Sequence, residues 1–304
     1  MRMKSNTLMI TGVTGYIGSR LLKKMMMAGW DVVAIVRSDS DQSQVDRLKR
    51  EITVISYDFH LPTLIKTMQN IQPQVVVHIA SHYLATHNSD DIDQLIDGNI
   101  RYSTHLMQAV LESGVRKFIN TSSFTQHRIN QNFQPLSLYA STKQAFESII
   151  EYYSQMGNLQ VITLELFDNY GPEDTRPKFL NALIKAYRTG ESLNASLGYQ
   201  RMDLVYIDDV IDAYQKAIEL LMEDKIIGHQ KFAVSSGHSF SLRDLTNVLE
   251  RLTGESILVN WGAVPYRDNQ IMKPWNKRGG LPGWNSVVSL EEGVRRILNS
   301  DTRD

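Results

Sequence analysis

Residues 7 to 37 constrain the possible fold more than any other part of the chain, because they read TLMITGVTGYIGSRLLKKMMMAGWDVVAIVR. An apolar strand, a glycine-rich turn, an amphipathic helix and a second apolar strand follow one another, which is the order of a βαβ unit. Gly12, Gly15 and Gly18 fall where the first strand turns into the helix. Glycines at such a turn let the backbone approach a pyrophosphate, which then lies on the amides of the helix N-terminus. The segment therefore predicts a dinucleotide-binding turn.

Short apolar runs continue to alternate with helical stretches after this unit. Three further strand-like runs begin at residues 52, 74 and 116 and read ITVISYD, QVVVHIA and RKFINTS. We therefore expect an α/β fold with a doubly wound parallel sheet, the Rossmann architecture, and a smaller α/β lobe at the C-terminal end. We expect the first domain to span 1–165 and the second 166–304, with segments near 203–235 returning to the first.

The composition argues against several classes of partner. Lys and Arg total 32 against 33 Asp and Glu, so no strongly basic surface indicates nucleic acid or an acidic membrane. The chain has no cysteine, which rules out disulfides and thiolate metal sites and suits a reducing compartment. The N-terminus runs directly into the first strand, and no apolar run reaches membrane-spanning length. We expect a cytoplasmic protein with no nucleic-acid or membrane partner and no metal site.

Residues 135 to 150, which read PLSLYASTKQAFESII, place Tyr139 four positions before Lys143 near the start of a helix. Ser137 is a favourable N-cap residue, and apolar side chains follow at helical spacing. Residues four apart lie one above the other on a helix, so the phenol and the ammonium should touch. Taken alone, the pair favours an ordinary helix start over a catalytic role, because Tyr and Lys at this spacing occur by chance in many helices.

Six motifs along the chain together resemble the extended short-chain dehydrogenase/reductases, the NAD-dependent epimerase/dehydratase family. In chain order they are the G-x-x-G-x-x-G turn, HIAS at 78–81, TSS at 121–123, Tyr139 with Lys143, LFDNYGP at 166–172 and DLVYIDDV at 203–210. They cover nearly the whole chain in the order of the family. The resemblance implies an enzyme with a nicotinamide dinucleotide cofactor, in which the Tyr and the Lys are catalytic.

The resemblance gives the pair a chemical role. An unperturbed phenol has a pKa of about 10, and a nearby ammonium favours the phenolate and so brings the phenol nearer to working pH. Lys143 would also hold the nicotinamide ribose. In this family a hydroxyl at the end of the preceding strand completes the catalytic site. Alignment of FINTSS implies Thr121 for this role, with Ser122 or Ser123 as alternatives.

The residues after the second strand favour NADP over NAD as the cofactor. A carboxylate at this place bonds the ribose 2′-hydroxyl of NAD, whereas an arginine accommodates the 2′-phosphate of NADP. The strand DVVAIV ends in Arg37 and Ser38. The alternative is that Arg37 is solvated and that Asp39 or Asp41 binds the ribose of NAD. The resemblance implies further cofactor contacts at Tyr16, Ile17, Asp58, Phe59, Ala80 and Ser81.

The reaction class also comes from the resemblance. The 4,6-dehydratases of the family carry Thr-Asp-Glu where this chain has TSS, and serines make poor general acids near neutral pH. The C-terminal stretches WGAVPYRDNQIM and LPGWNSVVSLEEGVRRIL look like those of the CDP-abequose synthase group and related 4-ketoreductases. We therefore predict NADPH-dependent reduction of the 4-keto group of a CDP- or dTDP-linked deoxyhexose, in deoxysugar or surface polysaccharide biosynthesis. The alternatives are a nucleotide-sugar epimerase that retains NAD and a non-catalytic protein that senses dinucleotides.

A further set of residues is predicted to bind the nucleotide diphosphate sugar. They are Ser122, Ser123, Asp168, Asn169, Arg201 and Arg267. Arg267 matches the diphosphate-binding arginine of the family, and arginine is the usual bidentate partner of phosphate. Asp168 stands at a position where the family commonly has an amide, and it reads equally well as a turn residue before Gly171. The resemblance also implies a homodimer through helices near 100–112 and 140–156, although one chain alone could equally bury those faces.

Overall fold

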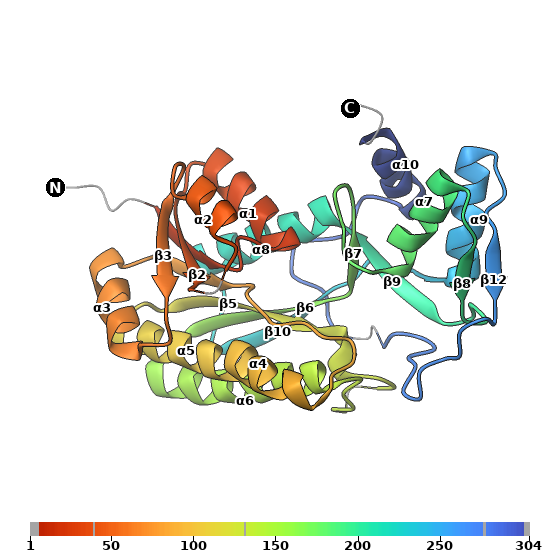
Figure 1. Ribbon diagram of the computed structural model, residues 1–304. Helices are drawn as coiled ribbons and strands as arrows, with labels where there is room; N and C mark the ends of the chain where they lie inside the picture. Colours follow the sequence, from red (N-terminus) through yellow and green to blue (C-terminus); the bar gives the residue numbers. More distant parts are fainter. Residues whose placement is uncertain (1–5, 39, 131, 276–277, 301–304) are drawn as a thin grey trace.

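The computed structural model describes residues 6–38, 40–130, 132–275 and 278–300. Its centre is a sheet of seven strands in the order β10-β6-β5-β4-β1-β2-β3 (Figure 1). The strands are β1 (Thr7–Thr11), β2 (Asp31–Arg37), β3 (Thr53–Tyr57), β4 (Val75–His78), β5 (Lys117–Ser123), β6 (Gln160–Leu166) and β10 (His229–Val234). Every neighbouring pair in this sheet is parallel, so the predicted doubly wound Rossmann sheet is confirmed.

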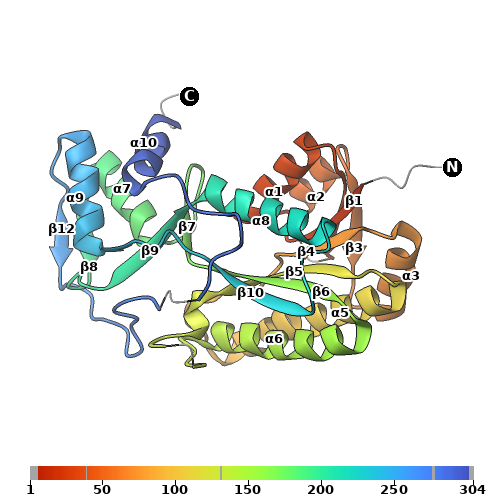
Figure 2. The same cartoon turned by 180° about the vertical axis from the view of Figure 1, so that it is seen from behind.

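Helices cover both faces of this sheet (Figures 1 and 2). One face carries α1 (Tyr16–Met27), α2 (Gln42–Leu48) and α8 (Ile207–Met222), and the other carries α3 (Leu61–Ile71), α5 (Tyr102–Ser113) and α6 (Leu138–Gly157). The central strands are buried on both faces, which is why they read as nearly continuous apolar runs. Ile10 packs with Leu21 on the α1 side, whereas its neighbour Met9 packs with Leu106 on the α5 side.

The second lobe is built from short strands and helices. A three-stranded sheet has the order β11-β9-β7, and a two-stranded sheet pairs β12 with β8. The elements are β7 (Asp168–Tyr170), α7 (Phe179–Thr189), β8 (Leu193–Ala195), β9 (Arg201–Tyr206), β11 (Ser239–Ser241), α9 (Leu242–Thr253), β12 (Val259–Trp261) and α10 (Leu290–Ser300). Between them the chain returns to the first lobe, because α8 packs on α1 and β10 pairs with β6. The division at residue 165 stays a prediction.

Local sequence signals begin and end several helices. Ser137 caps α6 by accepting a hydrogen bond from the Ala140 amide at 3.3 Å, as its place before the amphipathic stretch predicts. Helix α7 ends at Gly190, whose φ of 68° is the left-handed conformation of a glycine after a helix. The short helix α4 (Ile92–Ile96) and the π-helical turn η2 (Asp97–Arg101) lead directly into α5. None of the described helices is long and apolar enough to cross a membrane.

The strand order changes direction between β1 and β4, and this opens a crevice at their carboxyl ends. The Thr11 hydroxyl accepts hydrogen bonds from the Ile79 and Ala80 amides at 3.1 Å each. The same hydroxyl can therefore donate a hydrogen bond to Nδ1 of His78, 2.8 Å away. Nε2 of His78 forms a hydrogen bond with the Ser103 hydroxyl at 2.9 Å. Burial holds the pKa of His78 well below its ordinary value, so the ring is neutral and can accept at Nδ1. These bonds tie the two sides of the crevice together.

Candidate active site

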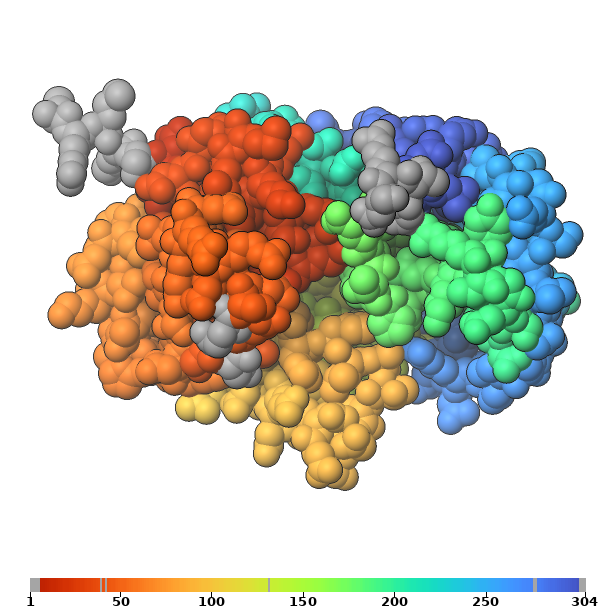
Figure 3. Space-filling view, turned by 45° about the horizontal axis from the view of Figure 1, so that its top comes forward, coloured from red at the N-terminus to blue at the C-terminus, as the bar shows by residue number. Residues whose placement is uncertain are grey.

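A cavity of about 660 Å³ lies at the carboxyl ends of β1, β2, β4 and β5, between the sheet and the second lobe. In the space-filling view, red and orange N-terminal segments face green segments of the second lobe across the middle of the molecule (Figure 3). Most of the residues predicted for the site line this cavity: Gly12, Gly15, Tyr16, Ile17, Gly18, Arg37, Ala80, Ser81, Thr121, Ser122, Ser123, Tyr139, Lys143, Asp168, Asn169 and Arg267. The predicted residues outside its lining are Ser38, Asp58, Phe59 and Arg201.

The glycine turn is shaped by close backbone contacts. Gly12 has a φ of 77°, and a Cβ there would lie 2.7 Å from the Ala80 nitrogen. A Cβ on Gly18 would overlap the carbonyl oxygen of Gly12. Helix α1 begins at Tyr16 with Gly15 as its N-cap, so no side chain caps the first amides. Because this turn lines the cavity, its amides suit a pyrophosphate.

Tyr139 and Lys143 lie one turn apart on α6, and both line the cavity. Burial raises the pKa of Tyr139 to about 12, against a hydrogen bond with Ser81 that lowers it. The expectation that Lys143 brings the phenol pKa nearer to neutrality is therefore wrong for this fold, because burial dominates. Burial also lowers the pKa of Lys143 to about 8, against the Glu147 carboxylate that raises it. Tyr139 is thus protonated at neutral pH, as a proton donor must be.

The three hydroxyls at the end of β5 have different partners. Thr121 shares a hydrogen bond of 2.6 Å with the hydroxyl of Tyr214 on α8. Ser122 donates to Glu147 on α6, across the sheet from α8. Ser123 caps the turn that follows the strand and is partly buried. The structure brings all three to the cavity, and the choice of Thr121 as the catalytic hydroxyl stays a prediction.

Arg37 and Tyr102 line the cavity near the end of β2. The Arg37 guanidinium reaches η2, where a Cβ on Gly98 would lie 3.5 Å from its Nη1. Tyr102, one turn later, is 1% exposed, and its hydroxyl has no hydrogen-bond partner among the described residues. A buried hydroxyl without a partner is unfavourable, so this one is available to a ligand.

The sequence leaves two acidic residues, Asp39 and Asp41, as alternative partners of the cofactor ribose. Asp41 caps α2 by accepting hydrogen bonds from the Ser43 amide at 2.8 Å and the Ser43 hydroxyl at 2.7 Å. Asp39 lies outside the described residues. The carboxylate of Asp41 is therefore already engaged in a helix cap.

Two of the predicted residues outside the cavity have partners elsewhere. Asp58 accepts a hydrogen bond from the His60 amide at 3.1 Å. Arg201 forms an ion pair of 3.6 Å with Asp244 at the start of α9. Their predicted contacts with the adenine and the phosphates stay predictions.

Cationic side chains line the cavity on the side of the second lobe. Arg176, Lys178 and Arg267 are there together with Asp168 and Asn169. Arg176 donates to Oδ1 of Asn169 at 2.7 Å, and Lys178 donates to the Asn169 carbonyl oxygen at 2.7 Å. Burial raises the pKa of Asp168 and lowers the pKa of Lys178. This side of the cavity therefore suits an anionic ligand.

A comparison with models of known protein families agrees with the resemblance that the motifs indicate. The profile of the NAD dependent epimerase/dehydratase family matches residues 8–227. The chain belongs to this family. Family membership confirms the resemblance and the prediction that the chain is an NAD(P)-dependent enzyme. The matched range contains the glycine turn, the pair of Tyr139 and Lys143 and the β5 hydroxyls.

Members of the family with known activities are similar to nearly the whole chain. The CDP-abequose synthase of Salmonella muenchen is 26% identical over 295 residues, which cover 96% of this chain and 97% of that protein. The UDP-glucuronate 4-epimerase of Thermodesulfobacterium geofontis is 23% identical over 313 residues, covering 96% and 94%. The crystal structure of UDP-glucuronic acid 4-epimerase from Bacillus cereus, with UDP-glucuronic acid and NAD, has a TM-score of 0.83 at 23% identity and covers 98% and 99%. The likeness to this solved structure confirms the fold class.

Asn99, in η2, supports the site, and no sequence pattern singled it out. Its Oδ1 accepts hydrogen bonds from the Ser81 hydroxyl at 3.0 Å and the His82 amide at 2.7 Å. Its Nδ2 donates to the Thr142 hydroxyl on α6 at 3.0 Å. Asn99 thus ties Ser81, the partner of the Tyr139 hydroxyl, to the helix that carries Tyr139. An asparagine before a helix carries no distinctive pattern, so this role follows from the structure alone.

Tyr83 is a second residue of the site that the sequence did not indicate. Its ring packs edge-on against that of Tyr139, with centroids 4.9 Å apart. Burial raises the pKa of Tyr83, with a smaller contribution from Asp168 and an opposing one from Arg267. Tyr83 therefore contacts the ring of Tyr139 and is influenced by the charged groups on the side of the second lobe.

Proposed function

We propose that the protein is an NADPH-dependent 4-ketoreductase that acts on a nucleotide-linked deoxyhexose. The observation that carries the proposal is the protonated phenol of Tyr139 in a cavity with cations on two sides. Arg37 is on the side of β2, and Arg267 with Lys178 is on the side of the second lobe. A dinucleotide and a nucleotide diphosphate are both anions, so each side suits one of them. Similarity to CDP-abequose synthases supports a role in deoxysugar biosynthesis.

Each catalytic side chain has a defined task in this reaction. Tyr139 donates its phenolic proton to the carbonyl oxygen of the sugar, and Ser81, bonded to Asn99, holds the phenol in place. The ammonium of Lys143 stabilises the phenolate that remains. A β5 hydroxyl, assigned to Thr121, hydrogen-bonds the same carbonyl oxygen. When bound, NADPH supplies the hydride.

The described residues fit NADP better than NAD. The guanidinium of Arg37 can form charge-assisted hydrogen bonds with a 2′-phosphate. Burial raises the pKa of Tyr102, so its hydroxyl, which no described residue bonds, is protonated and can donate to the same group. The competing carboxylate of Asp41 is held in a helix cap. The Bacillus cereus enzyme in the complex cited above binds NAD, so the choice of NADPH is a property that we propose for this chain.

The substrate would lie with its diphosphate toward the second lobe. Arg267 and Lys178 are the cations that we assign to the diphosphate, and Arg176 is held by Asn169 beside them. We assign Asp168, which lines the cavity and whose pKa is raised by burial, to a sugar hydroxyl. Reduction of a ketone needs no further acid and base pair, in contrast to elimination of water.

We also propose that two chains associate through α5 and α6. Tyr152 and Met156 on α6 are 59% and 65% exposed, which is unusual for large apolar side chains. Light scattering after size-exclusion chromatography would measure the mass of the particle. A monomer at micromolar concentration would contradict the dimer.

A nucleotide-sugar epimerase that retains NAD is the second candidate. The similarity to UDP-glucuronate 4-epimerases in sequence and fold favours it. An epimerase recycles its hydride and keeps the cofactor, whereas a reductase exchanges it. The dinucleotide released from denatured protein, identified by mass spectrometry, distinguishes the two: stoichiometric NAD would support the epimerase.

Turnover with defined substrates is the decisive test of the proposal. Purified protein would be mixed with NADPH and each of the CDP-, dTDP-, GDP- and UDP-4-keto-6-deoxyhexoses, and absorbance of NADPH would be followed. We expect oxidation of NADPH with a CDP- or dTDP-linked sugar. Absence of turnover with all four would refute the reductase and leave the epimerase or a protein that only binds dinucleotides.

A further inference from the structure

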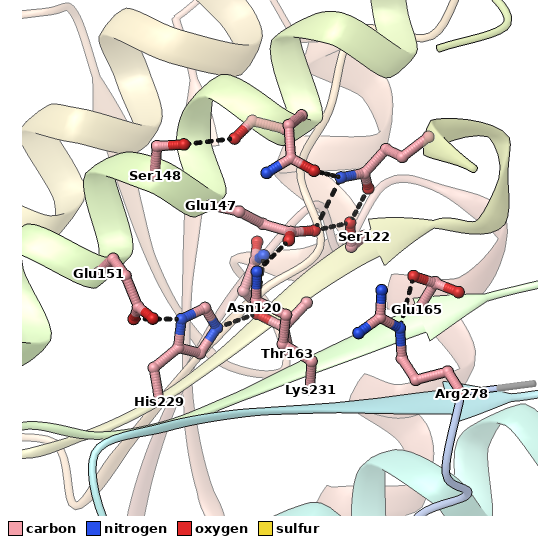
Figure 4. A network of polar contacts seen from close by, with 12 residues as sticks. Asn120, Ser122, Glu147, Ser148, Glu151, Thr163, Glu165, His229, Lys231 and Arg278 are labelled. Atoms are coloured by element: carbon pink, nitrogen blue, oxygen red, sulfur yellow. Dashed lines mark hydrogen bonds and ion pairs between the residues drawn. The ribbon is translucent and has the colours of Figure 1, made fainter. Parts of the chain in front are cut away.

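A buried polar network lies between α6 and the strands β5, β6 and β10 (Figure 4). Helix α6 also carries Tyr139 and Lys143. Glu147 is at the centre of the network, with 3% of its side chain exposed. Its carboxylate accepts hydrogen bonds from Ser122 and from Nε2 of Gln126 at 3.0 Å, and it pairs with the Lys231 ammonium at 2.8 Å. Although burial opposes ionisation, these partners keep the pKa of Glu147 below its ordinary value. Glu147 is therefore an anion at neutral pH.

Glu147 follows Lys143 by one helical turn, so both side chains project from the same face of α6. Lys143 is 2% exposed. Burial lowers its pKa to about 8, and Glu147 is the charge that raises it. On the facing strand β4, His78 is neutral, because burial holds its pKa well below the ordinary value. Without the Glu147 carboxylate, Lys143 would lose its proton at a still lower pH.

We propose that Glu147 is a positioning residue of the reaction, whose buried carboxylate keeps the Lys143 ammonium charged at working pH. Lys231, Ser122 and Gln126 hold this carboxylate in place. The inference rests on the proposed function, because it requires a charged Lys143 to stabilise the phenolate of Tyr139. Glu147 itself does not line the cavity, so it acts only through Lys143.

The other titratable groups around Glu147 have partners of their own (Figure 4). On β10, Nδ1 of His229 lies 3.0 Å from the carboxylate of Glu151. On β6, Glu165 accepts a hydrogen bond from Arg278 at 3.0 Å, and burial raises its pKa to about 7. Burial lowers the pKa of both His229 and His127, so neither imidazole carries a full charge at pH 7. The charge state of Lys143 at neutral pH therefore depends on Glu147.

The test is the pH profile of ketoreduction by Glu147→Gln, which removes the charge and keeps the shape of the side chain. Turnover requires the charged form of Lys143, so the wild-type rate should fall as the pH rises through about 8. In Glu147→Gln the midpoint of this fall should move down by about one pH unit, since an opposite charge one helical turn away on a buried helix face shifts a pKa by about that order. Glu151→Gln is the matched control, because it removes a carboxylate from the same helix one turn further on. Its midpoint should equal that of the wild type.

A second variant separates electrostatics from loss of structure. Glu147→Gln alone leaves Lys231 without its ion-pair partner, which destabilises this part of the fold. The double variant Glu147→Gln with Lys231→Met removes both charges and should recover stability. It still lacks the carboxylate, so its midpoint should stay lowered. Return of the midpoint to the wild-type value in the double variant would overturn the proposal.

The pKa of Lys143 can also be measured without a substrate. Protein labelled with ¹³C at lysine Cε would be titrated by NMR, and the Lys143 signal assigned by its loss in Lys143→Arg. Glu147→Gln should lower this pKa, whereas Glu151→Gln should leave it unchanged. An unchanged titration in Glu147→Gln would overturn the inference. A lowered one in a protein that reduces none of the four keto-sugars would support the electrostatic role and refute the proposed reaction instead.

Discussion

Replacing Tyr102 with phenylalanine removes one buried hydroxyl and keeps the contacts of the ring. The ring stacks on Tyr57 with centroids 5.2 Å apart, and it packs edge-on to His78 at 5.7 Å. Since no described residue bonds the hydroxyl, its removal should raise the free energy of unfolding by about 1 to 3 kcal/mol. For a chain of this size, Tm should rise by roughly 2 °C for each kcal/mol. Differential scanning fluorimetry of the protein without added cofactor measures this change.

The same substitution should weaken binding of the cofactor. A hydrogen bond from Tyr102 to a charged 2′-phosphate contributes about 1.5 to 3 kcal/mol, so Kd for NADPH should rise roughly 10- to 150-fold. NADH has no 2′-phosphate and should bind to Tyr102→Phe nearly as to the wild type. Titrations followed by the fluorescence of the reduced nicotinamide measure both affinities. A gain in stability together with a loss of NADPH affinity is a combination that a packing role cannot produce.

Tyr153→Phe is the matched control for this experiment. The Tyr153 hydroxyl donates to Gln108 at 2.8 Å, so its removal should lower the free energy of unfolding by about 1 kcal/mol and leave NADPH binding unchanged. Two results would refute the reasoning for Tyr102. One is a loss of stability in Tyr102→Phe, and the other is an unchanged affinity for NADPH.

The remaining substitutions test the catalytic acid and the two anion sites. Tyr139→Phe should fold and bind NADPH but reduce the keto-sugar roughly 10²- to 10⁴-fold more slowly in single-turnover kinetics; more than half of the wild-type rate would exclude Tyr139 as the proton donor. Arg37→Ala should weaken the binding of NADPH by about 1.5 to 3 kcal/mol and the binding of NADH far less. Fluorescence titrations measure both affinities, and equal losses would contradict the NADP assignment. Arg267→Ala should raise KM with a smaller effect on kcat in steady-state assays, because a phosphate remote from the carbonyl is bound similarly in ground and transition states. An unchanged KM would remove Arg267 from the diphosphate site.

The sheet and its helices could be predicted because local rules determine them. In the βαβ unit at residues 7–37, Gly12 adopts a left-handed φ of 77°, and a Cβ on Gly18 would overlap the Gly12 carbonyl oxygen six residues earlier. Both reasons lie within the turn itself. Ser137 begins α6 and Gly190 ends α7 through contacts with the adjoining turn, which are likewise local. The return of β10 to the first sheet is different, since pairing with β6 depends on contacts far apart in the chain. The sequence predicted that segments near 203–235 return to the first domain, but the pairing of β10 with β6 came from the structure.

The site could be predicted only where motif residues carry it. Lys178 and Tyr83 reach the cavity from loops whose course depends on tertiary packing, and neither belongs to a pattern. The pKa of Tyr139 was expected to fall because Lys143 is near, yet burial raises it to about 12. Sequence spacing reports which groups are neighbours. It does not report how much water each group loses on burial. For Tyr139 that loss decides the direction in which the pKa shifts.

Glu165 on β6 is paired with a guanidinium that comes from a distant segment of the chain. Arg278 donates to Glu165 at 3.0 Å and lies 3.0 Å from Nε2 of His127. A carboxylate that is 3% exposed needs such a cation, because an unpaired charge would be strongly unfavourable there. The pair also ties the segment around residue 278 to β6, and the Ala233 amide donates to the Gly279 carbonyl oxygen at 3.0 Å on β10. The segment around residue 278, which lies between the two C-terminal stretches that resemble those of 4-ketoreductases, is therefore held to the first lobe by an ion pair.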